Sequence, residues 1–196
     1  MFIDEPDEAG VEGDVAQWYE RQRASWGYLP NYASAFAARP DVAEAWNSLN
    51  GAIRSHMDRR RYELVTIAAA RVYRSTYCMA AHSKFLRDDV GDEATMRIVT
   101  ADPDAAALDG TDRAVMGFAA QVARDASSIT AADVQGLREL GLADADIVDV
   151  ALAAAARAFF TKVLDALGVQ ADAELGEQFD PEVRAQVTVG RPIADR

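Results

Sequence analysis

The sequence contains very little cysteine and histidine, with one Cys and two His among 196 residues. A single cysteine excludes a disulfide within the chain, and so few of these residues cannot supply the clustered ligands of a structural zinc site. We therefore expect no bound metal and no flavin, haem or other cofactor. The one thiol, Cys78, is then either a small buried hydrophobe or a reactive group.

Positive charge is also scarce, since 20 Lys and Arg stand against 32 Asp and Glu, for a net charge of −12. Nucleic acids and anionic membrane surfaces bind clustered positive side chains, so we expect neither as a partner. The sequence has no apolar run of about eighteen residues that could span a membrane. Residues 1–10 (MFIDEPDEAG) lack the basic and apolar segments of a signal peptide, and we expect a cytoplasmic protein.

Proline and glycine are few, at six and twelve residues, while half of the residues are apolar. This composition favours an all-α fold over a sandwich or barrel. The length predicts one domain. We divide the chain into an N-terminal arm (1–13), a helical domain (14–170) and a C-terminal tail (171–196). The arm and the tail are expected to be ordered only where a neighbour holds them.

Apolar periodicity and capping residues predict the helices of the domain. The segment 62–73 is apolar on almost every side, so we expect it to be the buried central helix. Ser75 or Thr76 is expected to cap the next helix, which carries Cys78. The expected helices cover residues 14–26, 32–38, 42–57, 62–73, 76–89, 93–100, 111–124, 130–141 and 144–167.

Four residues around the central helix form the candidate catalytic set. Cys78 and His82 are four residues apart, so they share one face of a helix, and Ser75 lies three residues before Cys78 on that face. Glu63 lies fifteen residues before Cys78. It reaches the same place only if the central helix packs antiparallel beside the cysteine helix.

These residue types suit attack on a peroxide. Cys78 lies in the first turn of its predicted helix, where backbone amides and a nearby cation are expected to lower the pKa of the thiol. His82 can accept the proton, and Glu63 can orient His82 or relay protons through the Ser75 hydroxyl. The product would be a sulfenic acid that a second thiol reduces.

The same residues resemble the alkylhydroperoxidase (AhpD-like) and carboxymuconolactone decarboxylase superfamily. Its peroxidase members carry a Glu, then a Cys-x-x-Cys motif, then a His four residues after the second Cys, and Glu63, Cys78 and His82 fit this spacing. Ser75 stands in place of the first cysteine of the motif, and Tyr77 where some members have a further histidine. Further matches to the longer, peroxidase-related branch extend the resemblance over roughly residues 27–170, at 27–31 (GYLPN), 39–40 (RP), 137–142 (LRELGL) and 165–169 (DALGV).

The resemblance implies a multi-helix bundle that assembles as a homotrimer or homohexamer, with the cysteine near the base of a buried cavity. It also implies hydroperoxide reduction. Because Ser75 replaces the first cysteine of the motif, the disulfide of the family's usual mechanism cannot form within it. Cys78 would then be recycled by an external thiol or dithiol reductant.

Two alternatives stay open. In the first, the protein acts on a small lactone or carboxylic acid as in the decarboxylase branch, with His82 and Glu63 as acid and base. In the second, it is a non-catalytic oligomeric relative. Cys78 and His82 would then be core residues, and Glu63 would neutralise Arg71 or Arg74 or cap a helix.

Overall fold

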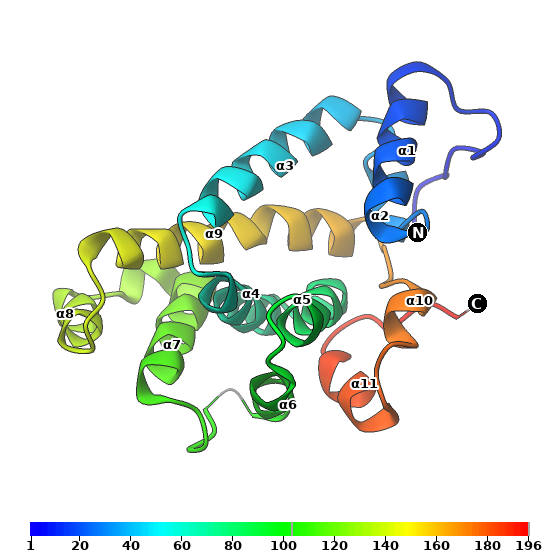
Figure 1. Cartoon of the computed structure of the whole chain (residues 1–196). Helices are drawn as coiled ribbons and strands as arrows, with labels where there is room; N and C mark the ends of the chain where they lie inside the picture. Colours follow the sequence, from blue (N-terminus) through cyan, green and yellow to red (C-terminus); the bar gives the residue numbers. More distant parts are fainter. Residues whose placement is uncertain (103, 196) are drawn as a thin grey trace.

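The computed structural model describes residues 1–102 and 104–195, so Pro103 and the last residue of the predicted tail, Arg196, lie outside the described residues. The described residues form eleven α-helices and one short 3-10 helix and contain no strand, which confirms the all-α class. The helices are α1 (Gly13–Trp26), α2 (Asn31–Ala35), α3 (Pro40–Ser55), α4 (Arg59–Tyr73), α5 (Thr76–Asp88), α6 (Glu93–Ala101), α7 (Gly110–Asp125), η1 (Ala126–Ser128), α8 (Ala131–Glu139), α9 (Asp144–Ala166), α10 (Ala173–Gly176) and α11 (Pro181–Val187) (Figure 1).

The central helix is α4, as its apolar composition predicted. Every residue from Tyr62 to Ala70 is buried, and α4 packs against α5, α7 and α9. The helix begins three residues earlier than expected because the Asp58 carboxylate caps it, accepting a hydrogen bond from the Arg61 backbone N–H at 3.0 Å. Arg59, Arg60 and Arg61, which lie outside the expected helix, therefore form its first turn.

These arginines orient α4 against its neighbours. Because all three are partly exposed, each ion pair adds little stability alone, and together the pairs link the first turn of α4 to its neighbours. The pairs are Arg59 with Asp89 after α5 (2.9 Å), Arg60 with Asp92 before α6 (2.6 Å) and with Asp112 of α7 (2.7 Å), and Arg61 with Asp146 of α9 (2.9 Å).

The segment after residue 170 contains two helices that the sequence analysis missed. The core includes Val183 and Val187 of α11, which packs against α5 and α6 of the same chain. The signal was present in Asp180 followed by Pro181, since an aspartate cap and a proline in the first turn mark a helix start.

The C-terminal end of the chain also closes tightly over the start of α5. The Gly190 N–H donates a hydrogen bond to the Thr76 hydroxyl at 3.0 Å, and a Cβ atom at Gly190 would lie only 1.8 Å from the Arg74 carbonyl oxygen. At the other end, the Phe2 N–H donates to the Leu167 carbonyl at 2.8 Å. Both terminal segments thus contact the chain's own helices, while the predicted domain boundaries stay a prediction.

Among the described helices, none combines the length and the apolar character that crossing a membrane requires.

Candidate active site

The turn between α4 and α5 brings Glu63 and His82 together. Arg74 ends α4 in the left-handed conformation (φ 56°), and α5 then returns along α4, which confirms the antiparallel arrangement. The His82 Nδ1 atom lies 2.5 Å from Glu63 Oε2, and the other carboxylate oxygen lies 2.7 Å from Arg59 Nε. Glu63 therefore pairs with Arg59 and His82, and not with Arg71 or Arg74.

His82 is held as a neutral ring that can accept a proton. Burial lowers the pKa of His82 below its ordinary value of 6.5, and the neighbouring Glu63 opposes this only in part. A neutral imidazole beside a carboxylate carries its hydrogen on the nitrogen that faces the carboxylate, so Nδ1–H donates to Glu63. The unprotonated Nε2 atom is then the proton acceptor.

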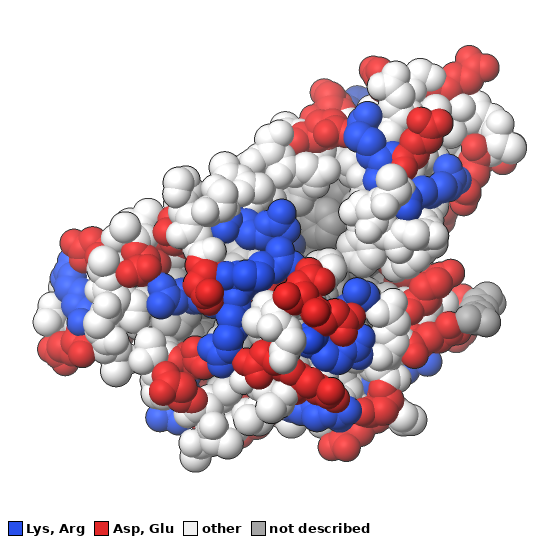
Figure 2. Space-filling model, viewed as in Figure 1, with Lys and Arg blue, Asp and Glu red and all other residues white. Residues whose placement is uncertain are grey.

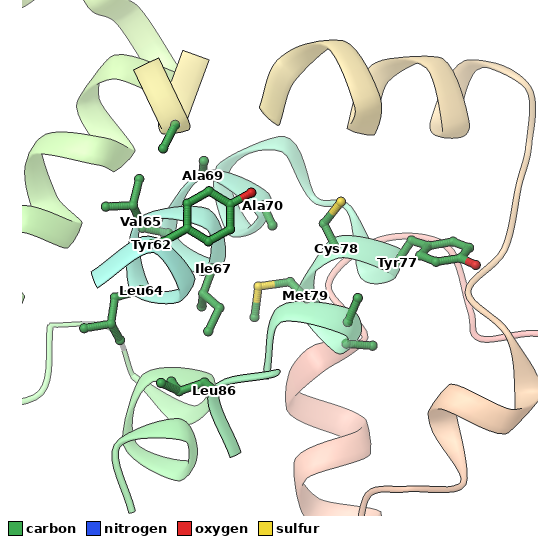
Figure 3. Packing of buried hydrophobic residues seen from close by; sticks show 14 of the residues in the cluster. Tyr62, Leu64, Val65, Ile67, Ala69, Ala70, Tyr77, Cys78, Met79 and Leu86 are labelled. Carbon is green, nitrogen blue, oxygen red and sulfur yellow. The ribbon is translucent and has the colours of Figure 1, made fainter. Parts of the chain in front are cut away.

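Cys78 projects from the first turn of α5. Figure 3 shows Met79 pointing toward Ile67 of α4 and Tyr77 pointing the other way, while the Cys78 sulfur points in a third direction. The thiol is 1% exposed, and burial raises its pKa, against the effects of the Arg157 guanidinium and the Ser75 hydroxyl. The expected lowering of this pKa was therefore wrong, because burial outweighs the position at the helix N-terminus.

Arg157 of α9 is the site residue that sequence reasoning missed. Its side chain is 4% exposed, and its Nη1 atom lies 4.0 Å from the Cys78 sulfur. Its Nη2 atom donates to Asn50 Oδ1 at 2.9 Å and to the Tyr62 hydroxyl at 3.0 Å. The guanidinium carbon lies 5.4 Å from the ring centroid of Trp46, within cation–π range. A permanent positive charge is thus fixed beside the thiol.

These groups line one pocket of about 130 Å³. No hydrogen bond joins Cys78 to His82 in the described part of the chain, so the pocket brings their side chains to one space without direct contact. Figure 2 shows this face of the molecule hollowed between α3 and the corner formed by α1 and α2. The lining residues are Trp26, Tyr32, Trp46, Asn47, Asn50, Arg54, Arg59, Tyr62, Glu63, Tyr77, Cys78, Ala81, His82, Phe85, Arg157 and Phe160.

Ser75 is the one predicted site residue that does not line the pocket. It is buried as the N-cap residue of α5, one of the two caps expected there, although its hydroxyl makes no capping hydrogen bond. Its hydroxyl still favours the Cys78 thiolate through its effect on the pKa of that thiol. Ser75 therefore acts on the sulfur from outside the pocket.

The described residues contain no group of three or more His, Cys, Asp and Glu side chains that could hold a metal ion. Glu63 and His82 are a pair of such residues, and the second oxygen of Glu63 pairs with Arg59. That the protein uses no cofactor stays a prediction.

The comparisons with known proteins agree with this fold. The model of the carboxymuconolactone decarboxylase family matches residues 40–100, which include Glu63, Ser75, Cys78 and His82. No curated protein matches the sequence. The resemblance to the AhpD-like and carboxymuconolactone decarboxylase superfamily, predicted from the site spacing, is confirmed by this match and by the similar solved structures.

A peroxidase-related protein from Ralstonia eutropha JMP134, described as an alkylhydroperoxidase AhpD core, is 22% identical over 97% of both chains with a TM-score of 0.77. A peroxidase-related protein from Silicibacter sp. TM1040 is 25% identical over 89% of this chain and 93% of its own, with a TM-score of 0.78. The debrominase Bmp8, in complex with 2,3,4-tribromopyrrole as a cysteine-to-alanine variant, is 13% identical over 95% and 96% of the chains, with a TM-score of 0.72. At 22% and 13% identity, the likenesses to the Ralstonia protein and to the debrominase are of fold alone.

Proposed function

We propose that the protein reduces hydroperoxides through Cys78 as its single reacting cysteine. The observation that carries this proposal is the pocket in which a thiol, a permanent cation and a neutral, carboxylate-held imidazole share one space. A thiol attacks a peroxide only after it loses its proton, and the departing oxygen must gain one. The pocket contains a group for each need.

In the proposed reaction, His82 Nε2 accepts the Cys78 proton, directly or through a water, and Glu63 stabilises the imidazolium that forms. Arg157 stabilises the thiolate, which attacks the terminal peroxide oxygen. The O–O bond breaks, and the alkoxide receives the proton from His82. One thiol and one hydroperoxide thus give one sulfenic acid and one alcohol.

An external thiol must complete the cycle, because the chain has no second cysteine. The first thiol displaces water from the sulfenic acid to form a mixed disulfide, and a second thiol releases Cys78 as a free thiol. We place this cycle in the cytoplasm, where low-molecular-weight thiols are kept reduced.

The test is peroxide consumption in the presence of a monothiol or a dithiol. The parent protein is expected to turn over with a monothiol, and Cys78→Ala is expected to show none of that turnover. Ser75→Cys, which restores the motif, is expected to gain turnover with a dithiol. Equal consumption by the parent and Cys78→Ala would overturn the proposal.

The second candidate is action on a small lactone or carboxylic acid. The match of residues 40–100 to the carboxymuconolactone decarboxylase family favours it, as does an arginine in the pocket that can bind a carboxylate. In that reaction His82 and Glu63 would transfer the protons, and Cys78 would only line the pocket. Cys78→Ala would keep such an activity, whereas it abolishes peroxide reduction.

We also propose that the chain assembles with itself as a homotrimer or homohexamer. The face formed by α3 and α9 exposes a set of large apolar side chains, which monomers seldom leave uncovered. Substituting Leu152→Glu there is expected to lower the mass measured by light scattering. The exposed residues of this face are Val42, Leu49, Val148, Leu152 and Phe159.

A further inference from the structure

The charges that line the Cys78 pocket do not balance. Three arginines and one carboxylate, Glu63, contribute to its wall. Glu63 pairs with Arg59 and His82, and Arg59 also pairs with Asp89. Within residues 1–102 and 104–195, this leaves Arg54 and Arg157 without a carboxylate partner. A protein of net charge −12 has thus placed two uncompensated cations around its reactive thiol.

Arg157 is the more informative of the two because it is buried. Burying an arginine without an anionic partner costs free energy, so the charge is expected to have a use. Its contacts to Asn50, Tyr62 and Trp46 fix the position of the guanidinium but do not neutralise it. Its buried Nε–H has no hydrogen-bond acceptor among the described residues. The side chain therefore keeps both its charge and a free donor.

Arg54 lies at the entrance to the pocket. A neighbouring pocket of about 420 Å³ shares Trp26, Arg54, Arg59 and Phe85 with the Cys78 pocket, and Arg54 is exposed to solvent where the two pockets meet. Figure 2 shows Lys and Arg side chains gathered beside the hollow, where α3 is followed by α4. A negatively charged ligand would meet Arg54 first and Arg157 at the base.

The walls between these two cations are largely aromatic, and they include Trp26, Tyr32, Phe85 and Phe160. The inner pocket, at about 130 Å³, is below the size of pockets that hold drug-sized ligands. We infer that the Cys78 pocket selects a small organic carboxylate with an apolar or aromatic body, whose charge is recognised by Arg157 and Arg54. This inference rests on the proposed function for its chemistry, since the ligand is either the hydroperoxide or the thiol that recycles Cys78.

The preference can be measured without peroxide. Iodoacetate and iodoacetamide both alkylate the Cys78 thiolate and release iodide. Iodoacetate carries a negative charge, whereas iodoacetamide is neutral. Both rates depend in the same way on the fraction of Cys78 that is ionised. This fraction therefore cancels when the iodoacetate rate constant is divided by the iodoacetamide rate constant. We expect this ratio to exceed that of a free small-molecule thiol by about tenfold, because the pocket attracts the anionic reagent.

Two arginine variants separate a local effect from a general one. Arg54→Gln is expected to lower the ratio about threefold, and any change in the ionised fraction of Cys78 cancels in that ratio. Arg113→Gln removes the same charge from an exposed position on α7 that does not line the pocket, and is expected to change neither rate. A ratio no higher than that of the free thiol, or one that both variants change alike, overturns the inference.

Two substrate comparisons identify which ligand bears the carboxylate. Cumene hydroperoxide is compared with its para-carboxylate, and 2-mercaptoethanol with 3-mercaptopropionate. A preference for the anionic peroxide that Arg54→Gln lowers assigns the site to the substrate, and the same result with the thiols assigns it to the reductant. If the alkylation ratio is high and no peroxide is consumed, the anion site stands and the proposed function fails.

Discussion

The two sides of the Cys78 pocket differ in how well their charges are matched. On the imidazole side, formed by Arg59, Glu63 and His82, each carboxylate oxygen has a partner within 2.7 Å. On the thiol side, formed by Cys78 and Arg157, the sulfur lies 4.0 Å from Arg157 Nη1, and no carboxylate among the described residues pairs with the guanidinium. On the imidazole side the charge of Glu63 is already paired. On the thiol side the charge of Arg157 is paired only when the sulfur ionises or an anion binds.

This difference assigns separate tasks to the two sides. A set of groups joined by an ion pair and a hydrogen bond holds one protonation state and one orientation of the ring, which is what a proton acceptor needs. An unmatched cation in a buried place favours any state that brings a negative charge to it. Since burial raises the pKa of Cys78, the thiol stays protonated until both sides act together.

The largest expected effect is the loss of the thiol itself. Cys78→Ala is expected to reduce peroxide consumption to the background rate, because no other cysteine exists in the chain. The matched control is Ser83→Ala on the same helix, which alters a buried residue outside the pocket whose hydroxyl has no hydrogen-bond partner among the described residues. This control should retain the parent rate. A similar loss in both variants would show that the effect comes from a disturbed α5.

The next effect should come from the imidazole side. His82→Gln is expected to slow sulfenic acid formation by about 10²–10⁴-fold, the usual contribution of a general base. Glu63→Gln should cost roughly 10–100-fold, because the glutamate acts only through the ring that it orients. Stopped-flow measurement with one equivalent of peroxide gives both values. A larger loss in Glu63→Gln than in His82→Gln would reverse the roles assigned here.

On the thiol side, Arg157→Met is expected to slow peroxide reduction by roughly a hundredfold. The sign of the pKa change follows from the charge: the cation favours the thiolate, so its removal raises the pKa of Cys78 further. The alkylation rate of Cys78 measured against pH should therefore move to higher pH. Arg157→Lys is the conservative control and should restore part of the shift. An unmoved profile would mean that Arg157 does not act on the sulfur.

The smallest effect concerns stability. The pKa of His82 is lowered in the folded protein, so the unfolded chain takes up a proton near pH 6.5 before the folded one does. The stability that the neutral ring contributes is complete above pH 6.5 and is lost as the pH falls toward the pKa of the folded state. The slope is at most about 1.4 kcal/mol per pH unit.

Urea unfolding between pH 7 and pH 5 measures this slope. His82→Gln should flatten it, whereas His56→Gln, at an exposed position that follows α3, should leave it unchanged. Equal slopes in the parent and in His82→Gln would contradict the assignment of a neutral buried ring.

The sequence predicted the helices of the domain closely because their apolar periodicity is strong. The helix expected from residue 130 is present as α8, which Thr130 and Asp133 open with a capping box. The first residues of the helices were predicted less closely. Asp58, Asp109 and Asp180 cap their helices through side-chain hydrogen bonds, and the geometry of these bonds does not follow from the sequence alone. The two C-terminal helices are short, so they carry too few residues for a periodic signal.

The approach of Glu63 to His82 was predictable because both residues lie on consecutive helices whose turn is short. Arg157 was not found, since it lies 79 residues from Cys78 and belongs to a helix read as apolar. Its signal was its position: Ala154, Arg157 and Thr161 lie on the buried stripe of α9, where a charged residue is out of place. Because burying such a charge costs free energy, its presence on a buried stripe indicates a functional role.

The most direct test is to treat the parent protein with one equivalent of hydroperoxide in the presence of dimedone and to locate the adduct by mass spectrometry. The account predicts an adduct on Cys78 that forms rapidly in the parent and much more slowly in His82→Gln and Arg157→Met. No adduct on Cys78 in the parent, or an equal rate in all three proteins, would contradict it.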